Sequence, residues 1–147
     1  MSDAAPKPCF TTTRRVEFHD TDMAGIMHFA NFFRYMESAE HEFLRSIGHV
    51  VHRVDGGIAS GWPRVNASCD YRQPARFDEV LTVRVFLDEI RRRSVRYRFE
   101  FDAADGATRV ADGSLTVACV RLDQVSGGIE AVEIPDELRA ALEAAGR

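Results

Sequence analysis

The chain has few cysteines and no long apolar run, and these two features exclude several classes of protein. Its three cysteines, Cys9, Cys69 and Cys119, are odd in number, far apart and without the spacing of a metal site. A disulfide framework is therefore not expected, and a reducing compartment such as the cytoplasm fits best. No stretch approaches the roughly 18 apolar residues of a membrane span, and residues 1–10 contain no apolar run of signal-peptide length. We therefore expect no membrane partner.

A strong charge of either sign is also missing. The formal net charge is −4, so no global field attracts nucleic acid, and any phosphate binding must come from a local basic cluster. The chain has 147 residues, of which 45% are hydrophobic and 29% charged, and these values suit one globular domain. We expect residues 1–9, with Pro6 and Pro8, to form a flexible arm and residues 10–147 to form this single domain.

The spacing of the apolar residues predicts an α+β fold. Over residues 29–47 they recur every three or four positions, as in a long amphipathic helix, and Gly48 ends the pattern. A glycine-rich stretch over 49–63 is expected to be irregular, and a short helix is expected over 135–145. The expected strands cover residues 10–19, 64–72, 79–90, 92–102 and 108–122. Together they predict a five-stranded antiparallel sheet that covers one long helix, plus a short C-terminal helix.

The turn before the long helix holds the most informative pattern in the sequence. Asp20 and Asp22 share this turn with Gly25, and the helical pattern follows at once. Free N–H groups at a helix start can hold a developing negative oxygen, and a carboxylate beside them can attack a carbonyl or take a proton. This is the minimum equipment for hydrolysing an activated acyl group. We expect Asp20 to hold the turn, while spacing alone explains Asp22 equally well as a turn or cap residue.

Three blocks of sequence carry a resemblance to a known family. The first is VEFHDTD (16–22) with AGI (24–26) and NFFRYME (31–37), the second is VNASCDY (65–71) with FDEVLTV (77–83), and the third is IRRRS (90–94). Together they resemble the hotdog fold and, within it, the 4-hydroxybenzoyl-CoA thioesterase-like family of acyl-CoA thioesterases. The resemblance implies that Asp22 is the catalytic carboxylate. It also implies a homodimer or homotetramer with joined sheets and active sites at the subunit interface.

Residues on and before the long helix complete the predicted catalytic site. The backbone N–H of Phe29, at the helix start, is the candidate donor to an oxyanion. His28 either contacts the acyl group or is an ordinary packed histidine. Glu37 and Glu40 stay as rival catalysts, because a different hotdog branch uses a glutamate on this helix. On a helical projection Glu40 falls inside the apolar arc and Glu37 at its edge.

Substrate contacts are predicted on other strands. Arg91, Arg92 and Arg93 form either a solvated turn or a cluster that binds the phosphates of coenzyme A, which is the role that the family gives to basic residues here. Asn66 and Ser68 lie two apart on one strand face. Alternation together with the resemblance suggests that they point at the acyl pocket of the partner chain.

These observations predict an acyl-CoA thioesterase that releases a free acid and coenzyme A, with an Asp carboxylate as nucleophile or general base. Two alternatives remain: a hotdog hydratase or dehydratase, for which no hydratase-type motif is visible, and a non-catalytic protein that binds acyl thioesters. No cofactor is expected. A metal site is not predicted, since Arg45 stands where an H-E-x-x-H motif beginning at His41 needs its second histidine. The acyl group stays open.

Overall fold

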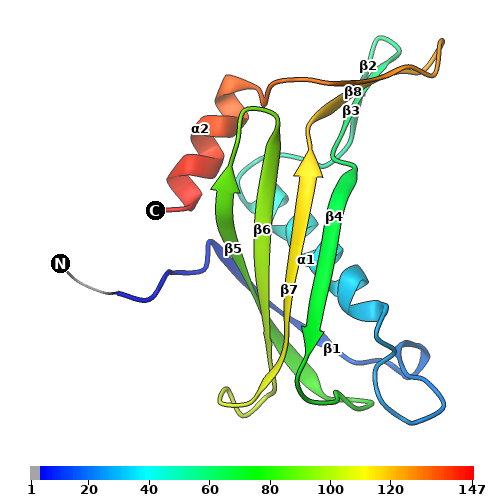
Figure 1. Cartoon of the computed structure of the whole chain (residues 1–147), viewed down its shortest axis with the longest axis vertical. Coiled ribbons are helices and arrows are strands. Elements are labelled where there is room, and N and C mark those ends of the chain that lie inside the picture. Colours follow the sequence, from blue (N-terminus) through cyan, green and yellow to red (C-terminus); the bar gives the residue numbers. More distant parts are fainter. Residues whose placement is uncertain (1–3) are drawn as a thin grey trace.

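The computed structural model describes residues 4–147, which form an α+β fold with one long helix against a sheet (Figure 1). The elements, in chain order, are β1 (Phe10–Arg15), the 3₁₀ turn η1 (Phe18–Asp20), α1 (Asn31–Ser46), β2 (Arg53–Asp55), β3 (Ile58–Gly61), β4 (Arg64–Tyr71), β5 (Val80–Ile90), β6 (Ser94–Asp102), β7 (Arg109–Ala118), β8 (Val120–Asp123), β9 (Ile129–Ala131) and α2 (Asp136–Ala145). Of the expected N-terminal arm, residues 1–3 lie outside the described residues, and residues 4–8 adopt no regular structure. Neither α1 nor α2 is long and apolar enough to cross a membrane.

The predicted five-stranded antiparallel sheet is present, in the order β1-β5-β6-β7-β4. Alternation decides its two faces. In β6 the side chains of Val95, Tyr97, Phe99 and Phe101 are buried, while the residues between them carry charge on the opposite face. Helix α1 lies along the buried face, as expected (Figure 1).

The expectation of a single sheet is wrong, because a second sheet of four strands is present in the order β2-β3-β8-β9. The stretch over 49–63, expected to be irregular, contains β2 and β3. The expected strand over 108–122 is two strands, β7 and β8. They separate at Cys119, whose N–H leaves the ladder to donate to the Arg93 carbonyl at 2.7 Å. On the neighbouring strand Pro63, which has no N–H, separates β3 from β4.

The first strand is also shorter than expected. It ends at Arg15, and the chain then turns through η1, where the N–H of Glu17 donates to Oδ2 of Asp20 at 3.0 Å. A side chain that accepts from the backbone in this way stabilises a turn at the expense of further strand pairing. The 3₁₀ turn redirects the chain toward the start of α1.

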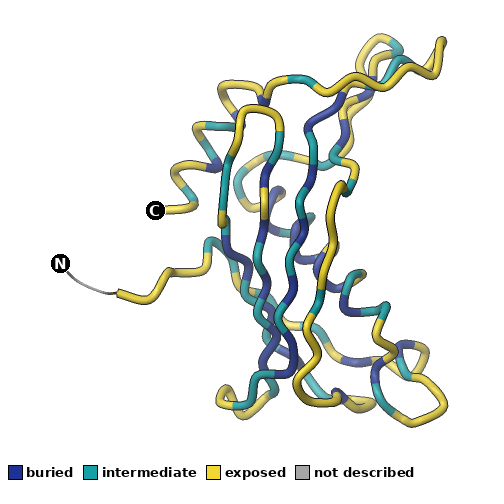
Figure 2. Tube along the Cα trace, in the orientation of Figure 1, coloured by how far each residue is buried: buried dark blue, intermediate teal, exposed yellow. Residues whose placement is uncertain are grey.

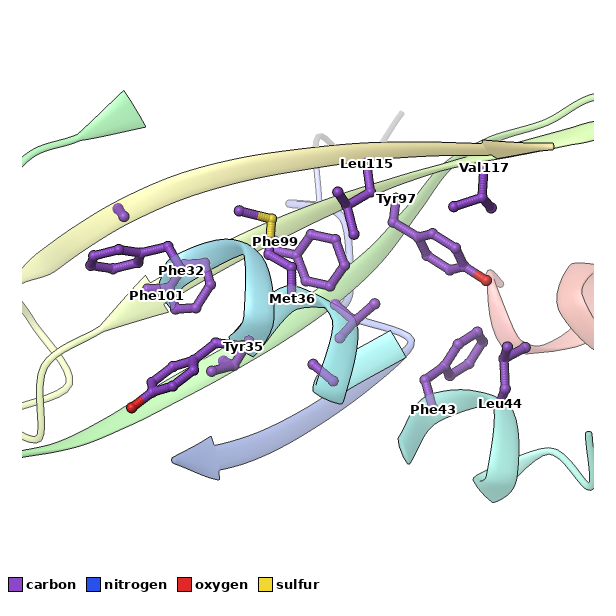
Figure 3. Packing of buried hydrophobic residues seen from close by; sticks show 14 of the residues in the cluster. Phe32, Tyr35, Met36, Phe43, Leu44, Tyr97, Phe99, Phe101, Leu115 and Val117 are labelled. Atoms are coloured by element: carbon purple, nitrogen blue, oxygen red, sulfur yellow. The ribbon is translucent and has the colours of Figure 1, made fainter. Parts of the chain in front are cut away.

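The core lies between α1 and the sheet. In Figure 3 Phe32, Met36 and Phe43 project from α1 toward Phe99, Leu115 and other residues of β6 and β7. Each such side chain contributes roughly 1.5–3 kcal/mol when it is fully buried. Gly113 in β7 allows this close approach, because a Cβ at that position would collide with the end of the Met36 side chain.

Strand β4 forms one edge of the five-stranded sheet and exposes most of its residues (Figure 2). Asn66 and Ser68 pair with Thr116 and Ser114 of β7, whereas Leu115 between those two is buried against α1. Alternation therefore places Asn66 and Ser68 together on the face of the sheet that is turned away from α1.

Helix α2 packs beside β5 at the end of the β5–β6 hairpin (Figure 1). Its Leu138 and Leu142 are buried. Arg139 donates from Nη2 to the carbonyl oxygens of Arg91 and Arg92, at 2.7 and 3.1 Å. The backbone of the triple-arginine turn is thereby fixed to α2.

Candidate active site

The Asp22 carboxylate sits in an exposed turn that holds one of its oxygens and leaves the other free. Oδ1 accepts from the N–H of Ala24 at 2.8 Å, and the main chain of Asp22 bonds to Ile26 and Gly25 at 2.9 and 3.0 Å. Gly25 has a φ of +77°, a conformation that glycine adopts without strain. Among the described residues no donor bonds to Oδ2. The carboxylate is thus oriented by its own turn and keeps one oxygen available for chemistry.

Asp20 has the structural role that the sequence predicted. Its side chain is buried, and Oδ2 accepts from the N–H of Glu17 at 3.0 Å and from the hydroxyl of Tyr35 at 2.7 Å. Its carbonyl accepts from the N–H of His28 and from Nδ2 of Asn31, both at 2.8 Å. Burial and the Asp20 carboxylate raise the pKa of Tyr35 far above its ordinary value, so that this hydroxyl remains a donor. These four bonds hold the turn against the start of α1.

A pocket of about 440 Å³ opens beside Asp22. Phe29 and Phe32 lie on one wall and Tyr71 on another, with the Tyr71 ring edge-to-face against both at centroid distances of 6.4 and 5.3 Å. Tyr71 also donates to the carbonyl of Phe29 at 3.0 Å. The remaining lining residues are Ile26, Met27, Arg72, Gln73, Pro74 and Ala75. The site is therefore a mostly apolar, aromatic cavity with a carboxylate at its edge, which is the usual composition of a small-molecule pocket.

Phe29 lines this pocket, and its backbone N–H is not hydrogen-bonded within the described part of the chain. Its neighbours Met27, His28 and Ala30 all donate their N–H groups to acceptors in the protein. Within residues 4–147, by contrast, the Phe29 N–H has no acceptor. Unbonded N–H groups next to a helix start are suited to hold negative charge. Asp22 and Phe29, the two residues that the sequence selected, thus line the same pocket.

His28 lies outside the lining of this pocket. Its ring stacks on Phe29 with centroids 4.6 Å apart, and its Nδ1 accepts from the N–H of Ala30 at 3.1 Å. The histidine therefore supports the backbone next to the pocket. Its predicted contact with the acyl group stays a prediction.

Glu40, one of the two rival carboxylates, is fully buried and paired with Arg64. Nη2 of Arg64 lies 2.7 Å from Oε1, and Nη1 lies 3.2 Å from Oε2. Burial raises the pKa of Glu40 to about 7, although Arg64 opposes this shift. Arg64 also donates to the carbonyl of Trp62 at 2.9 Å. The pair fastens α1 to the start of β4, and Glu40 does not line the Asp22 pocket.

Glu37, the second rival, is exposed and lies 3.6 Å from Arg64. It too is absent from the lining of the Asp22 pocket. Sequence reasoning missed Arg64 altogether. The available signal was the position of Glu40 in the apolar arc of its helix, because a buried carboxylate requires a cationic or hydrogen-bonding partner.

The triple-arginine turn lies at the opposite end of the sheet from Asp22 in the same chain (Figure 1). Arg91 donates to Glu89 at 2.8 Å and Arg92 to Glu133 at 2.6 Å. Arg93 has no carboxylate partner among the described residues. Within a single chain these arginines therefore do not reach the Asp22 pocket. Asn66 and Ser68 do not reach it either, because they face away from α1.

The sequence also did not single out the second wall of the pocket. Tyr71 and the segment that follows it reach the Asp22 turn through a bridge between Ile26 and Arg76 and through the Met27 N–H, which donates to Ala75 at 2.7 Å. These contacts join residues about 50 apart in the chain. The only available signal was Gln73-Pro74, which marks the end of a strand at this place.

Known proteins resemble this chain over most of its length. A model of the thioesterase-like superfamily matches residues 16–142. The chain is 28% identical over 135 residues to the 4-hydroxybenzoyl-CoA thioesterase of a Pseudomonas species, covering 85% of this chain and 91% of that protein. It is 25% identical over 132 residues to the acyl-CoA thioesterase YbgC of Haemophilus influenzae, covering 90% and 93%. The structure of a gentisyl-coenzyme A thioesterase matches with a TM-score of 0.76 and 26% identity, covering 90% and 99%.

Proposed function

The chain belongs to the thioesterase-like superfamily, as its sequence motifs predicted, and we propose that it is an acyl-CoA thioesterase in which Asp22 is the catalytic carboxylate. One observation carries this proposal: among residues 4–147, the same apolar pocket is lined by Asp22, which has a free carboxylate oxygen, and by Phe29, whose N–H has no acceptor. An acyl-transfer site needs a nucleophile or base together with a donor at the oxyanion position. The relatives named above are thioesterases that act on CoA thioesters.

The reaction follows from this geometry. The acyl group occupies the aromatic pocket, and its thioester oxygen accepts from the Phe29 N–H as negative charge develops there. Asp22 then acts in one of two ways: it removes a proton from water, whose oxygen bonds to the acyl carbon, or it attacks that carbon to form an anhydride that water cleaves. Both routes break the carbon–sulfur bond and give one acid and one thiol.

Single-turnover hydrolysis in ¹⁸O-labelled water tests for direct attack by Asp22. Attack forms an anhydride, and when water opens it at the aspartyl carbon, label enters the Asp22 side chain. A general base leaves the side chain unlabelled, as does an anhydride that water opens at the acyl carbon, so label in Asp22 is the result that identifies attack. Mass spectrometry of the peptide that contains Asp22 reads the difference.

We also propose that two chains join through their β4 edges. An exposed edge strand has unpaired N–H and C=O groups, and Val65 on β4 is 61% exposed. Antiparallel pairing of two β4 strands reverses the direction of the partner's sheet. The partner's Arg93 then lies at the same end of the assembly as Asp22, where a guanidinium is suited to a CoA phosphate. A strictly monomeric mass by light scattering would exclude this arrangement, and a tetramer of two such pairs would fit it.

The proposed reaction uses a carboxylate, an N–H donor and water, so we propose that it requires neither a metal nor a redox cofactor. The three cysteines are free in the structure, which suits a reducing compartment such as the cytoplasm.

A thiol-release screen over aromatic and aliphatic acyl-CoAs tests the activity. We expect turnover by the native protein and a loss of turnover in Asp22→Asn. Because the pocket is lined by aromatic rings, aromatic acyl groups should be among the better substrates. A protein that binds acyl-CoA without releasing thiol would identify the non-catalytic alternative, and reversible water addition to an enoyl-CoA would identify a hydratase.

A further inference from the structure

A second groove, between β1 and the N-terminal half of α1, differs in character from the Asp22 pocket. Its volume is about 420 Å³, and its walls are polar. The α1 wall is built by Asn31, Arg34, Tyr35 and Ser38, whose spacing of three and four places them on one stripe of the helix. Arg14 approaches from β1. No role in the proposed reaction involves this groove.

Two arginines in the groove lack partners. Among the described residues neither Arg14 nor Arg34 forms an ion pair or donates a hydrogen bond. The arginines on the outer face of the sheet behave differently, since Arg84, Arg98 and Arg109 all pair with carboxylates. Arg14 and Arg34 are thus two unpaired guanidinium groups that line one cavity.

The position of Arg14 is fixed by an aromatic ring. Its guanidinium carbon lies 4.7 Å from the centre of the Tyr35 ring, a cation–π contact. Tyr35 is in turn held by its hydroxyl bond to Asp20 at 2.7 Å. The contact with the ring leaves the N–H groups of Arg14 without acceptors. A donor that is already positioned loses less entropy when a ligand binds.

The acids that line the groove are engaged with other donors. Asp20 accepts from the N–H of Glu17 and from the hydroxyl of Tyr35, and Glu37 lies 3.6 Å from Arg64. Arg64 is itself paired with Glu40, so the formal charges of Arg14, Arg34, Asp20 and Glu37 cancel. The two guanidinium groups nevertheless keep unbonded N–H donors, and these donors are what the groove offers to an anion.

We propose that this groove binds a phosphate group, with Arg14 and Arg34 as the charged donors and the hydroxyl of Ser38 as a neutral one. Guanidinium groups match the geometry of phosphate oxygens and remain charged at any physiological pH. The phosphate belongs either to the nucleotide part of coenzyme A or to a free phosphorylated metabolite. In the first case the inference rests on the proposed thioesterase function, and in the second case it stands independently.

Calorimetric titration of the whole protein with inorganic phosphate and with 3′,5′-ADP tests the site without any substrate. We expect saturable binding that weakens by about tenfold in Arg34→Gln and in Arg14→Gln, the loss of one charged hydrogen bond. Arg34 is exposed and makes no contact that folding needs, so its variant keeps the test valid if Arg14→Gln is unstable. Arg45→Gln, an unpaired arginine outside the groove, is the matched control and should bind as the native protein does. Absence of saturable binding, or equal binding in all variants, overturns the proposal.

Kinetics separates the two sources of phosphate. If the phosphate belongs to the substrate, Arg34→Gln raises KM for an acyl-CoA but not for the matching N-acetylcysteamine thioester, which has no nucleotide. If it belongs to a free metabolite, phosphate binding is lost while both KM values stay unchanged. A protein that binds phosphate in this groove but releases no thiol would contradict the proposed function alone.

Discussion

Asp22 and Glu40 are carboxylates near the same helix, and their surroundings are opposite. Asp22 lies in an exposed turn, with one oxygen held by the N–H of Ala24 and the other free. Glu40 is fully buried, with both oxygens bound by Arg64. A catalytic carboxylate needs an open lone pair and a path for the reactant, whereas a buried and fully bonded one serves packing. The surroundings of a carboxylate, rather than its presence on a helix, therefore decide whether it is available for chemistry.

The largest expected effect is on the chemistry at Asp22. Asp22→Asn keeps the size of the side chain and its bond to Ala24 but removes the charge, so kcat should fall by about 10²-fold or more. The melting temperature should hardly change, because the residue is exposed. Steady-state kinetics with thermal melts measures both, and Glu40→Gln is the matched control. If Glu40→Gln abolishes turnover while Asp22→Asn keeps it, the roles of the two carboxylates are reversed.

The next effect is on stability at Arg64. Arg64→Ala leaves Glu40 without its cation, and breaking a buried pair in this way typically costs about 3–5 kcal/mol. The loss should be largest at pH 8, where Glu40 is ionised, and smaller at pH 5, where the carboxyl is already protonated and needs no cation. Urea unfolding at the two pH values measures it. An equal loss of unfolding free energy at pH 5 and pH 8 would mean that Arg64 acts mainly through its hydrogen bond to the Trp62 carbonyl and through packing.

A weaker effect should appear in the pH dependence of the native protein. Burial raises the pKa of Glu40 from 4.5 to about 7, so the folded state keeps a proton that the unfolded state loses. The contribution of Glu40 to stability is therefore complete below about pH 4.5 and is lost as the pH rises to 7, by at most about 3 kcal/mol. Comparing the slope of unfolding free energy against pH in the native protein and in Glu40→Gln isolates this group. Parallel slopes would show that Glu40 does not titrate in this range.

The smallest expected effect concerns the Asp22 turn itself. Gly25→Ala forces a side chain into a φ of +77° and should destabilise the protein by only about 1 kcal/mol. Because the turn orients the carboxylate, kcat of the folded variant should also fall, although the loss of stability is small. Ala24→Gly, which leaves the backbone bond to Asp22 in place, is the control. Unchanged kcat in Gly25→Ala would mean that the orientation of Asp22 does not depend on this turn.

Much of the fold was predictable because it depends on short-range periodicity. The three-and-four spacing in α1 and the alternation in β5 and β6 depend only on neighbours in the chain. The second sheet was not predictable, since β2 and β3 are short and the break at Cys119 depends on the distant carbonyl of Arg93. The glycine-rich character of 49–63 also concealed those strands.

The same distinction between local and long-range contacts applies to the candidate site. Asp22 and the Phe29 N–H lie in a local motif, and the sequence selected both. Tyr71 and Arg64 meet their partners only through the tertiary fold, at separations of 42 and 24 residues. Whether the triple-arginine turn reaches the pocket depends on a second chain, which no pattern within one chain can specify.

The missing side chain at Gly113 has a consequence for the layer of the core beneath the pocket. Met36 rests on the bare backbone there, and a Cβ at position 113 would collide with the flexible end of its side chain. Phe32, one helical turn before Met36, lines the Asp22 pocket. A larger residue at position 113 would therefore displace a side chain one turn away from the pocket lining, although residue 113 itself is not part of that lining.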